Sequence, residues 1–168
     1  MGNYSKIQYE LFGEKISKEE ADNNEYYEIA YYNEAEKRVK VELFENKQLS
    51  QLVYPDKEPP FEEIIREHLE CYPNMKMEIE TPKVFLDDGG YKYTSYIYLL
   101  HKNFELVKEC YFDKDDNLLR EVELDENNKP IVISTYVYDE SGELIEVIEE
   151  SPQGNTVGGL DFGNPQKF

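Results

Sequence analysis

The sequence has no tryptophan, two histidines, two cysteines and few positive charges, with 18 Lys and Arg against 37 Asp and Glu. The formal net charge of −19 repels nucleic acid and anionic lipid, which excludes nucleic-acid binding and favours encounter with basic partners. Solubility alone is the other interpretation of this charge. Two cysteines, Cys71 and Cys110, are too few for a framework of several disulfides. The sequence therefore predicts two free thiols, or a single disulfide if the compartment is oxidising.

Long apolar runs are also missing. No stretch approaches the roughly 18 apolar residues of a transmembrane helix, which excludes direct membrane insertion by a helix. Residues 1–4 lack the apolar region of a signal peptide, so the cytoplasm is the default location predicted from this sequence.

The chain does contain enough apolar and aromatic residues for one core. Its 168 residues are 39% hydrophobic and include 15 Tyr and 8 Phe. This length predicts a single domain, which we place at residues 1–150. Residues 151–168 are rich in glycine with little periodicity, and predict an irregular C-terminal tail docked by Leu160, Phe162 or Phe168.

Turn signals divide the second half of the chain into β-hairpins. Residues 87–90, 113–117 and 139–142 are clusters rich in Asp with Gly, Asn or Ser, and each lies between apolar runs. Such clusters reverse the chain because Gly and Asn tolerate positive φ and Asp bonds to its own backbone. The strands expected here span residues 84–86, 91–100, 104–112, 118–124, 131–138 and 143–149.

The first half predicts further strands and the main helix. A capping box at residues 17–20 predicts a short helix to about Asn23. Alternating apolar residues predict strands near residues 7–11, 26–32, 39–43, 49–54 and 75–80. The main helix is predicted from one apolar stripe, made of Phe61, Ile64, Ile65, His68, Leu69 and Tyr72.

These elements predict the α+β class, as a curved antiparallel β-sheet meander with one main amphipathic helix packed on one face. Burial of a charge beneath that helix is strongly unfavourable. We therefore expect the substitution Ile65→Asp to unfold the domain.

Two groups of polar residues have the chemistry of metal ligands. Asp113, Asp115 and Asn117 match the first three ligand positions of an EF-hand loop, but Leu118 and Leu124 stand where Gly and Glu are required. A hairpin tip is therefore the preferred interpretation of this loop.

His68 and Cys71 are the second group, with His101 and Cys110 as two further candidate ligands. Because His68 lies on the apolar stripe, a hydrogen-bonded core histidine is preferred over a ligand. The sequence contains no nucleophile motif and no Gly-rich phosphate loop. We therefore predict no catalytic residue, no metal, no cofactor and no enzymatic activity.

The open face of the hairpin sheet is the candidate binding surface. Alternation places Tyr and carboxylates on one side of these strands and apolar residues on the other. Tyr supplies contact area at low entropic cost, and carboxylates steer a basic partner. An ordinary half-solvated sheet is the alternative. The predicted partner-binding residues are Tyr96, Tyr98, Glu105, Glu109, Tyr111, Glu121, Glu123, Tyr136 and Tyr138.

A short pattern recurs along the hairpins: an aromatic residue or Leu, then Asp, then a turn residue and a new strand. It begins at Phe112, Leu124 and Tyr138, at spacings of 12 and 14 residues, so it is not a strict repeat array. The pattern resembles the YD-type hairpin units of some bacterial toxins and antitoxins, and a plain meander explains it equally well.

Residues 91–150, especially the hairpins at residues 113–117 and 139–142, resemble the TipC-like family of bacterial immunity proteins. That family protects streptococci against a secreted lipid II phosphatase toxin. The resemblance implies binding through a concave sheet face and a location outside the cytoplasmic membrane on an N-terminal anchor. The sequence shows no such anchor, and in this respect it departs from the family.

The leading hypothesis is therefore an immunity protein that binds and neutralises a cognate toxin with a basic surface, through an acidic, Tyr-rich sheet face. The alternatives are a structural or scaffolding β-hairpin module and a small-ligand carrier. An inhibitor is expected to bind the product of a neighbouring toxin gene in a salt-sensitive way, whereas a carrier is expected to retain a ligand.

Overall fold

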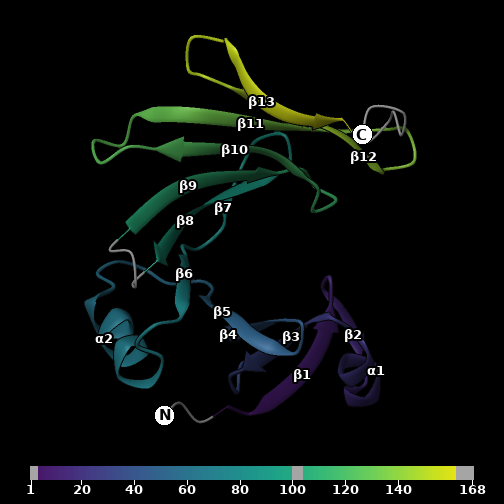
Figure 1. The fold of residues 1–168 in the computed structure, drawn as a ribbon, viewed down its shortest axis with the longest axis vertical. Coiled ribbons are helices and arrows are strands. Elements are labelled where there is room, and N and C mark those ends of the chain that lie inside the picture. The colour runs from purple at the N-terminus through teal and green to yellow at the C-terminus, as the bar shows by residue number, and fades with distance from the viewer. Residues whose placement is uncertain (1–3, 100–103, 162–168) are drawn as a thin grey trace. The chain divides into compact units, whose positions relative to one another are not determined.

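The computed structural model describes residues 4–99 and 104–161 (Figure 1). Contacts divide the chain into two compact units. Unit 1 comprises Met1–Pro82 and Tyr96–Glu105, and unit 2 comprises Lys83–Ser95 and Leu106–Phe168. The sequence predicted one domain at residues 1–150. Since the division runs through two strands of a hairpin, no linker or change of composition marks it.

Unit 1 is a sheet with two helices. The strand order is β6-β5-β4-β3-β1-β2, with the last residues of β8 beside β6. Its elements are β1 (Lys6–Leu11), β2 (Glu14–Ile16), α1 (Lys18–Asn23), β3 (Tyr26–Tyr32), β4 (Arg38–Glu45), β5 (Gln48–Tyr54), α2 (Glu62–Cys71), β6 (Lys76–Glu80) and residues 96–99 of β8 (Tyr91–Leu99).

One strand pair of unit 1 departs from the predicted antiparallel meander. β5 and β6 are parallel, with Leu52 opposite Met77 and Tyr54 opposite Ile79. The chain between them forms α2, and a helical crossover is what allows two successive strands to run in the same direction. β2 was also not predicted, because its three residues are too short to show an alternating pattern.

Both helices begin where the sequence indicated. The predicted capping box of α1 is present, since the Glu20 amide donates to Ser17 Oγ over 3.1 Å and the Ser17 amide donates to Glu20 Oε2 over 2.8 Å. α2 starts after Phe61 and is the longer of the two helices. The prediction of one main helix therefore holds in this coarse form.

α2 packs on one face of the sheet of unit 1. Phe61, Met77 and Ile79 form its buried cluster, and Ile64 and Ile65 pack against them. A second cluster of Ala30, Val41 and Val53 lies on the opposite face. Leu69 was expected in the buried stripe but is 41% exposed, so the contact between helix and sheet is narrower than predicted.

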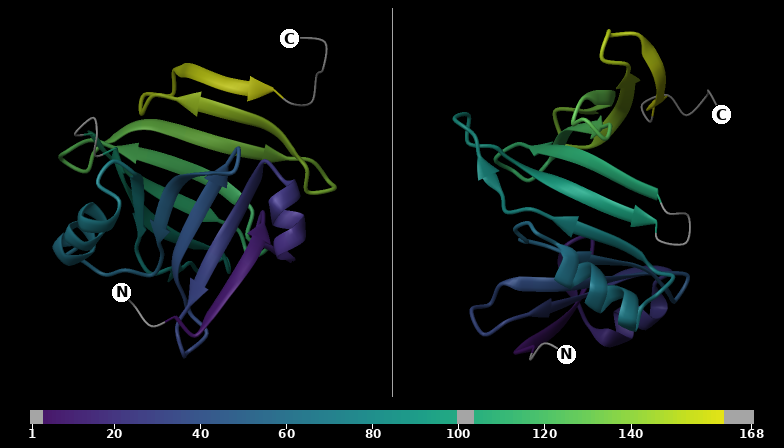
Figure 2. Two further views of the ribbon diagram at one scale, coloured as in Figure 1. Left: turned by 60° about the horizontal axis from the view of Figure 1, so that its bottom comes forward. Right: turned by 90° about the vertical axis from the view of Figure 1, so that its left-hand side faces the viewer.

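Unit 2 is an antiparallel sheet in the order β13-β12-β11-β10-β9-β8, with β7 beside β8. Figure 2 shows β9 to β13 side by side, and among the residues described for unit 2 there is no helix. Its elements are β7 (Val84–Phe85), residues 91–95 of β8, residues 106–112 of β9 (Phe104–Phe112), β10 (Leu118–Leu124), β11 (Pro130–Tyr138), β12 (Leu144–Glu150) and β13 (Thr156–Asp161).

β13 corrects the prediction of an irregular tail. Its residues pair with β12, Leu160 opposite Val147 and Gly158 opposite Glu149. The two adjacent glycines interrupt the alternation that marks a strand, which is why the sequence pattern did not reveal it. Leu100, His101, Phe162 and Phe168, which entered the predictions, lie outside the described residues.

Three hairpin turns of unit 2, those that begin at Asp113, Asp125 and Asp139, share one hydrogen-bonding pattern. Asp125 Oδ1 accepts the amides of Asn127 and Lys129, each over 2.8 Å. Asp113 and Asp139 accept the corresponding two amides in their own turns. The recurring Asp noted in the sequence therefore stabilises each reversal by accepting backbone N–H groups.

Candidate functional site

The register of unit 2 defines its two faces. Residues directly opposite each other in a sheet point to the same side. We call one side the Glu121 face, because Glu121 lies opposite Cys110 and Ser134. We call the other side the Val122 face, because Val122 lies opposite Glu109 and Ile133.

The predicted binding residues do not form one surface. Glu121, Glu123, Tyr136 and Tyr138 lie on the Glu121 face. Glu109 and Tyr111 lie on the Val122 face. Alternation within each strand was predicted correctly, but the pairing between β9 and β10 places the carboxylates of these two strands on opposite sides. The remaining predicted residues, Tyr96, Tyr98 and Glu105, belong to unit 1.

Glu121 is the centre of a hydrogen-bonded group on its face. Tyr136 Oη donates to Glu121 Oε2 over 2.6 Å, and Lys108 Nζ lies 3.5 Å from the same oxygen. Lys108 also lies 3.3 Å from Glu123 Oε1. Burial acts to lower the pKa of Lys108, but the two carboxylates outweigh it and raise that pKa above its ordinary value. Lys108 therefore forms ion pairs with Glu121 and Glu123, and these ion pairs hold the three side chains in place.

Tyr136 and Tyr138 are positioned by hydrogen bonds of their own. Burial, followed by donation to Glu121, raises the pKa of Tyr136, so the phenol stays protonated. Tyr138 Oη donates to the Leu118 carbonyl oxygen over 2.9 Å. Both residues are half-buried, and each hydroxyl is fixed by its hydrogen bond.

Glu109 has a comparable but separate group on the Val122 face. It accepts from Lys92 Nζ over 2.9 Å and from Tyr111 Oη over 2.8 Å. The hydrogen bond from Lys92 is the main reason that the pKa of Glu109 lies below its ordinary value. Glu109 is therefore ionised and already paired with a cation.

Tyr96 and Tyr98 serve the core of unit 1. Both pack against the cluster around Met77, and the Tyr96 ring lies 5.0 Å from the Phe61 ring. Burial and the neighbouring Glu105 raise the pKa of Tyr98. The two tyrosines therefore pack against the buried cluster beneath α2.

The sequence reasoning missed the contribution of β12 and β13 to the Glu121 face. Glu149 lies opposite Ser134 and Gly158, and Val147 lies opposite Tyr136 and Leu160. Leu160 is 54% exposed. An available signal was the charge of this segment, since no Lys or Arg occurs between Lys129 and Lys167.

Charge is distributed unevenly within unit 2. Lys83, Lys92 and Lys108 are each within 4 Å of a carboxylate, at 3.7, 2.9 and 3.3 Å. By contrast, Glu146, Glu149 and Glu150 of β12 make no ion pair or side-chain hydrogen bond with the described residues. The carboxylates of β12 are therefore not neutralised by any described cation.

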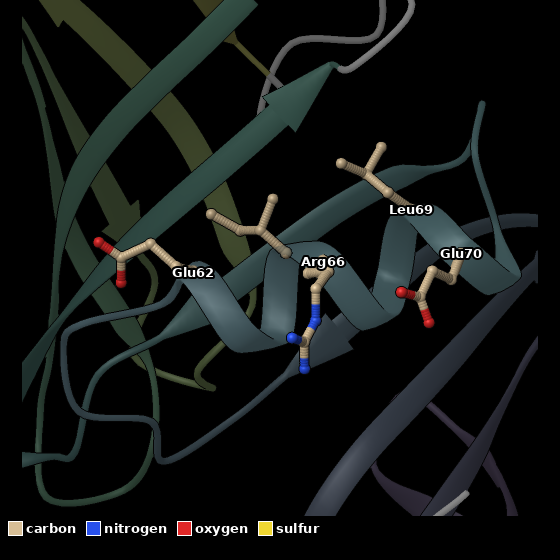
Figure 3. Close-up of a pocket in the computed structure, with 5 residues that line it drawn as sticks. Glu62, Arg66, Leu69 and Glu70 are labelled. Carbon is tan, nitrogen blue, oxygen red and sulfur yellow. The ribbon is translucent and has the colours of Figure 1, made fainter.

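Two surface hollows lie in unit 1. One, of about 310 Å³, has Val41, Leu43 and Val53 among its lining with Arg38 and several Glu side chains. The other, of about 460 Å³, follows α2 and is lined by Ile65 and Leu69 together with Glu62, Arg66 and Glu70. Figure 3 shows Leu69 and Arg66 projecting in different directions from α2.

His68 is a core histidine, as predicted. It is 1% exposed, its Nδ1 lies 3.0 Å from the Tyr54 hydroxyl, and its Nε2 lies 3.1 Å from the Met75 carbonyl oxygen. Because a carbonyl only accepts, Nε2 carries the proton and Nδ1 accepts from Tyr54. Burial lowers the pKa of His68, which keeps the ring neutral.

The other candidate metal ligands also have structural roles. Cys71 is exposed and Cys110 is buried, and they form no disulfide with each other. Asp113 Oδ2 accepts from Asn117 Nδ2 over 2.8 Å, in addition to the two amides that Oδ1 accepts, so its carboxylate is used within the turn. In the described part of the chain, no group of three His, Cys, Asp or Glu side chains is arranged to hold a metal.

Neither described helix is long and apolar enough to cross a bilayer. No family model, curated protein or solved structure matches this chain.

Proposed function

We propose that this chain is a non-enzymatic inhibitor of the immunity-protein class, which neutralises a toxin by binding a basic surface of it through unit 2. The carboxylates of β12 support this proposal most directly. They have no cation beside them among the described residues. Glu149 lies on the Glu121 face together with the exposed Leu160, whereas Glu146 and Glu150 lie on the Val122 face. A basic partner would neutralise the charge and cover the apolar side chains together.

The Glu121 face is the proposed interface, from β10 to β13. Half-buried tyrosines fixed by hydrogen bonds lose little side-chain entropy on binding, as a contact surface requires. Glu121 itself is a poor probe of binding, because its replacement would leave the Tyr136 hydroxyl without its acceptor and Lys108 with Glu123 alone. Glu149 is the better probe, since it lies on the same face without such partners.

The test is co-expression with the product of the adjacent gene, followed by size-exclusion chromatography at low and high salt. We expect one complex at low salt that weakens as salt rises, because the attraction is between exposed charges. Glu149→Lys should weaken the complex, whereas Glu140→Lys, with the same charge change in an exposed turn, should weaken it much less. Separate elution at both salts would contradict the proposal.

A structural β-hairpin module is the second candidate, favoured by the repeated Asp turns. Asp113, Asp125 and Asp139 accept amides in the same pattern, as expected of a repeated supersecondary unit. In that case the acidity serves solubility, and no toxin partner is expected at any salt concentration. The small-ligand carrier stays an alternative prediction, tested by native mass spectrometry of the purified chain.

A further inference from the structure

The two outer strands of the described sheets differ in how they are protected. β2 ends the order in unit 1, has three residues and is followed directly by α1. β13 is the outermost strand in the order of unit 2 and has six residues. Among the described strands, it pairs only with β12. Short edge strands, Lys, Pro and covering helices are the usual devices against unwanted strand addition. β13 contains no Lys or Pro; it ends on Asp161, and its pairing with β12 shifts register at Val157.

Among the described residues no strand pairs with the outer side of β13, and its two large apolar side chains are exposed. Val157 and Leu160 are 61% and 54% exposed. Gly158 and Gly159 carry no side chain to cover the strand, and a Cβ at Gly159 would lie 2.5 Å from the Val147 carbonyl oxygen. The close approach of β12 therefore favours glycine at Gly159, and at Gly158 the carboxylate of Glu149 occupies the position of a side chain.

We propose that β13 accepts an added β-strand from a partner protein, and that the added segment is extended and bears Lys or Arg. Strand addition satisfies the outer backbone groups of an edge strand, and side-chain chemistry then selects the partner. Glu146, Glu149 and Glu150 on the neighbouring strand select a basic segment. A second copy of this chain is disfavoured as the occupant, because it would bring the same carboxylates to the edge. This inference rests on the proposed function, since it names how the basic partner is held.

The first test uses a synthetic nonapeptide in which Lys alternates with Thr and Val. We expect the peptide to shift the amide resonances of residues 156–161 in the full-length chain and to slow their hydrogen exchange. A second peptide carries N-methyl groups on two adjacent central residues. Because adjacent N–H groups of an extended peptide point to its two opposite edges, this removes one donor from each edge. It should bind roughly tenfold more weakly, since neither edge of the peptide can pair fully. A peptide with Glu in place of Lys should also bind more weakly.

The proposal is overturned if the methylated peptide binds equally well, if the shifts map away from β13, or if no peptide binds at millimolar concentration. It is also overturned if the chain alone pairs through β13 with a second copy. Analytical ultracentrifugation of the wild-type chain and of Val157→Lys/Leu160→Lys distinguishes that outcome.

The second test uses the adjacent-gene product and the same double variant. Val157→Lys/Leu160→Lys should weaken the complex at least as much as Glu149→Lys does. The control is Val84→Lys/Phe85→Lys, which makes the same charge change at two exposed apolar positions of β7, outside the proposed interface, 55% and 77% exposed. If the complex forms but both double variants bind as wild type does, strand addition fails while the proposed function stands. If the peptide binds β13 but no complex forms, the proposed toxin inhibition fails instead.

Discussion

Unit 1 and unit 2 contain similar β-strands but are stabilised in different ways. In unit 1 the sheet is covered by α2, and both clusters of buried apolar side chains belong to it. In unit 2 the buried apolar residues Tyr91, Cys110 and Val122 form no such cluster, and among its described residues there is no helix. Its stability therefore depends more on strand pairing, capped turns and cross-strand side-chain pairs.

This difference matters for function because a sheet without a second layer keeps its side chains accessible. Most residues of the Glu121 face are only half-buried, and they are held in place by ion pairs and tyrosine hydrogen bonds. Unit 1 also has tyrosine hydrogen bonds and ion pairs, such as Tyr31 with Glu42, but it adds the two buried apolar clusters that the described residues of unit 2 do not form. We infer that unit 1 provides stability and that unit 2 provides the binding surface.

The largest expected effect is loss of the unit 1 core. Ile79→Ala should lower the free energy of unfolding by about 2–5 kcal/mol, because Ile79 is 0% exposed and its loss leaves a cavity under α2. Urea unfolding followed by circular dichroism measures this. Ile131→Ala, at a 45% exposed position of β11, is the control and should change stability by about 0.5 kcal/mol or less.

A matched pair of valines sharpens this comparison of the two units. Val53 and Val122 are 9% and 4% exposed, but only Val53 belongs to a buried cluster. Truncation to Ala removes about 1.6 kcal/mol of apolar transfer energy from either site, and packed neighbours add a cavity cost. Val53→Ala should therefore be the more destabilising, and a greater loss from Val122→Ala would contradict the proposed difference between the units.

A smaller effect is expected from the tyrosine hydrogen bonds of unit 2. Tyr136→Phe should destabilise the chain by about 1 kcal/mol, because it removes the donor to Glu121 while retaining the ring. Thermal unfolding provides the measurement. Tyr9→Phe is the control, since the Tyr9 hydroxyl makes no hydrogen bond among the described residues. Equal melting temperatures for wild type and Tyr136→Phe would show that the bond contributes nothing to stability.

The smallest effect concerns pH and belongs to unit 1. Burial lowers the pKa of His68 in the folded state, so the unfolded chain takes up a proton at higher pH than the folded chain. The contribution of neutral His68 is fully present above about pH 6.5 and is lost as the pH falls below it. Urea unfolding at about pH 7.5 and about pH 6 should show this loss, and His68→Gln should reduce it. An unchanged pH dependence in His68→Gln would rule out this group.

The main helix of unit 1, α2, could be predicted because two sequence signals agree. Phe61, Ile64 and Ile65 repeat at helical spacing, and two prolines precede them, so periodicity and boundary indicate the same element. The Asp turns were predictable for a similar reason, since an Asp followed by Gly or Asn has a direct backbone role.

The binding face could not be predicted as a whole, because strand register is not encoded within one strand. Glu109 lies between Lys108 and Cys110 and Glu121 between Arg120 and Val122, so the two look alike in sequence. Glu121 nevertheless pairs with Cys110, which places the two glutamates on opposite faces. Both faces of unit 2 mix polar and apolar residues, so no hydrophobic pattern specifies the register. β13 was missed because Gly158 and Gly159 give no strand signal.

The most direct test of the account is hydrogen exchange on the full-length chain, with and without its adjacent-gene partner at low salt. We predict that binding slows exchange in β10 to β13, most strongly in β12 and β13, and leaves α2 and β6 unchanged. Slowed exchange confined to unit 1, with β12 and β13 unaffected, would contradict the assignment of binding to unit 2.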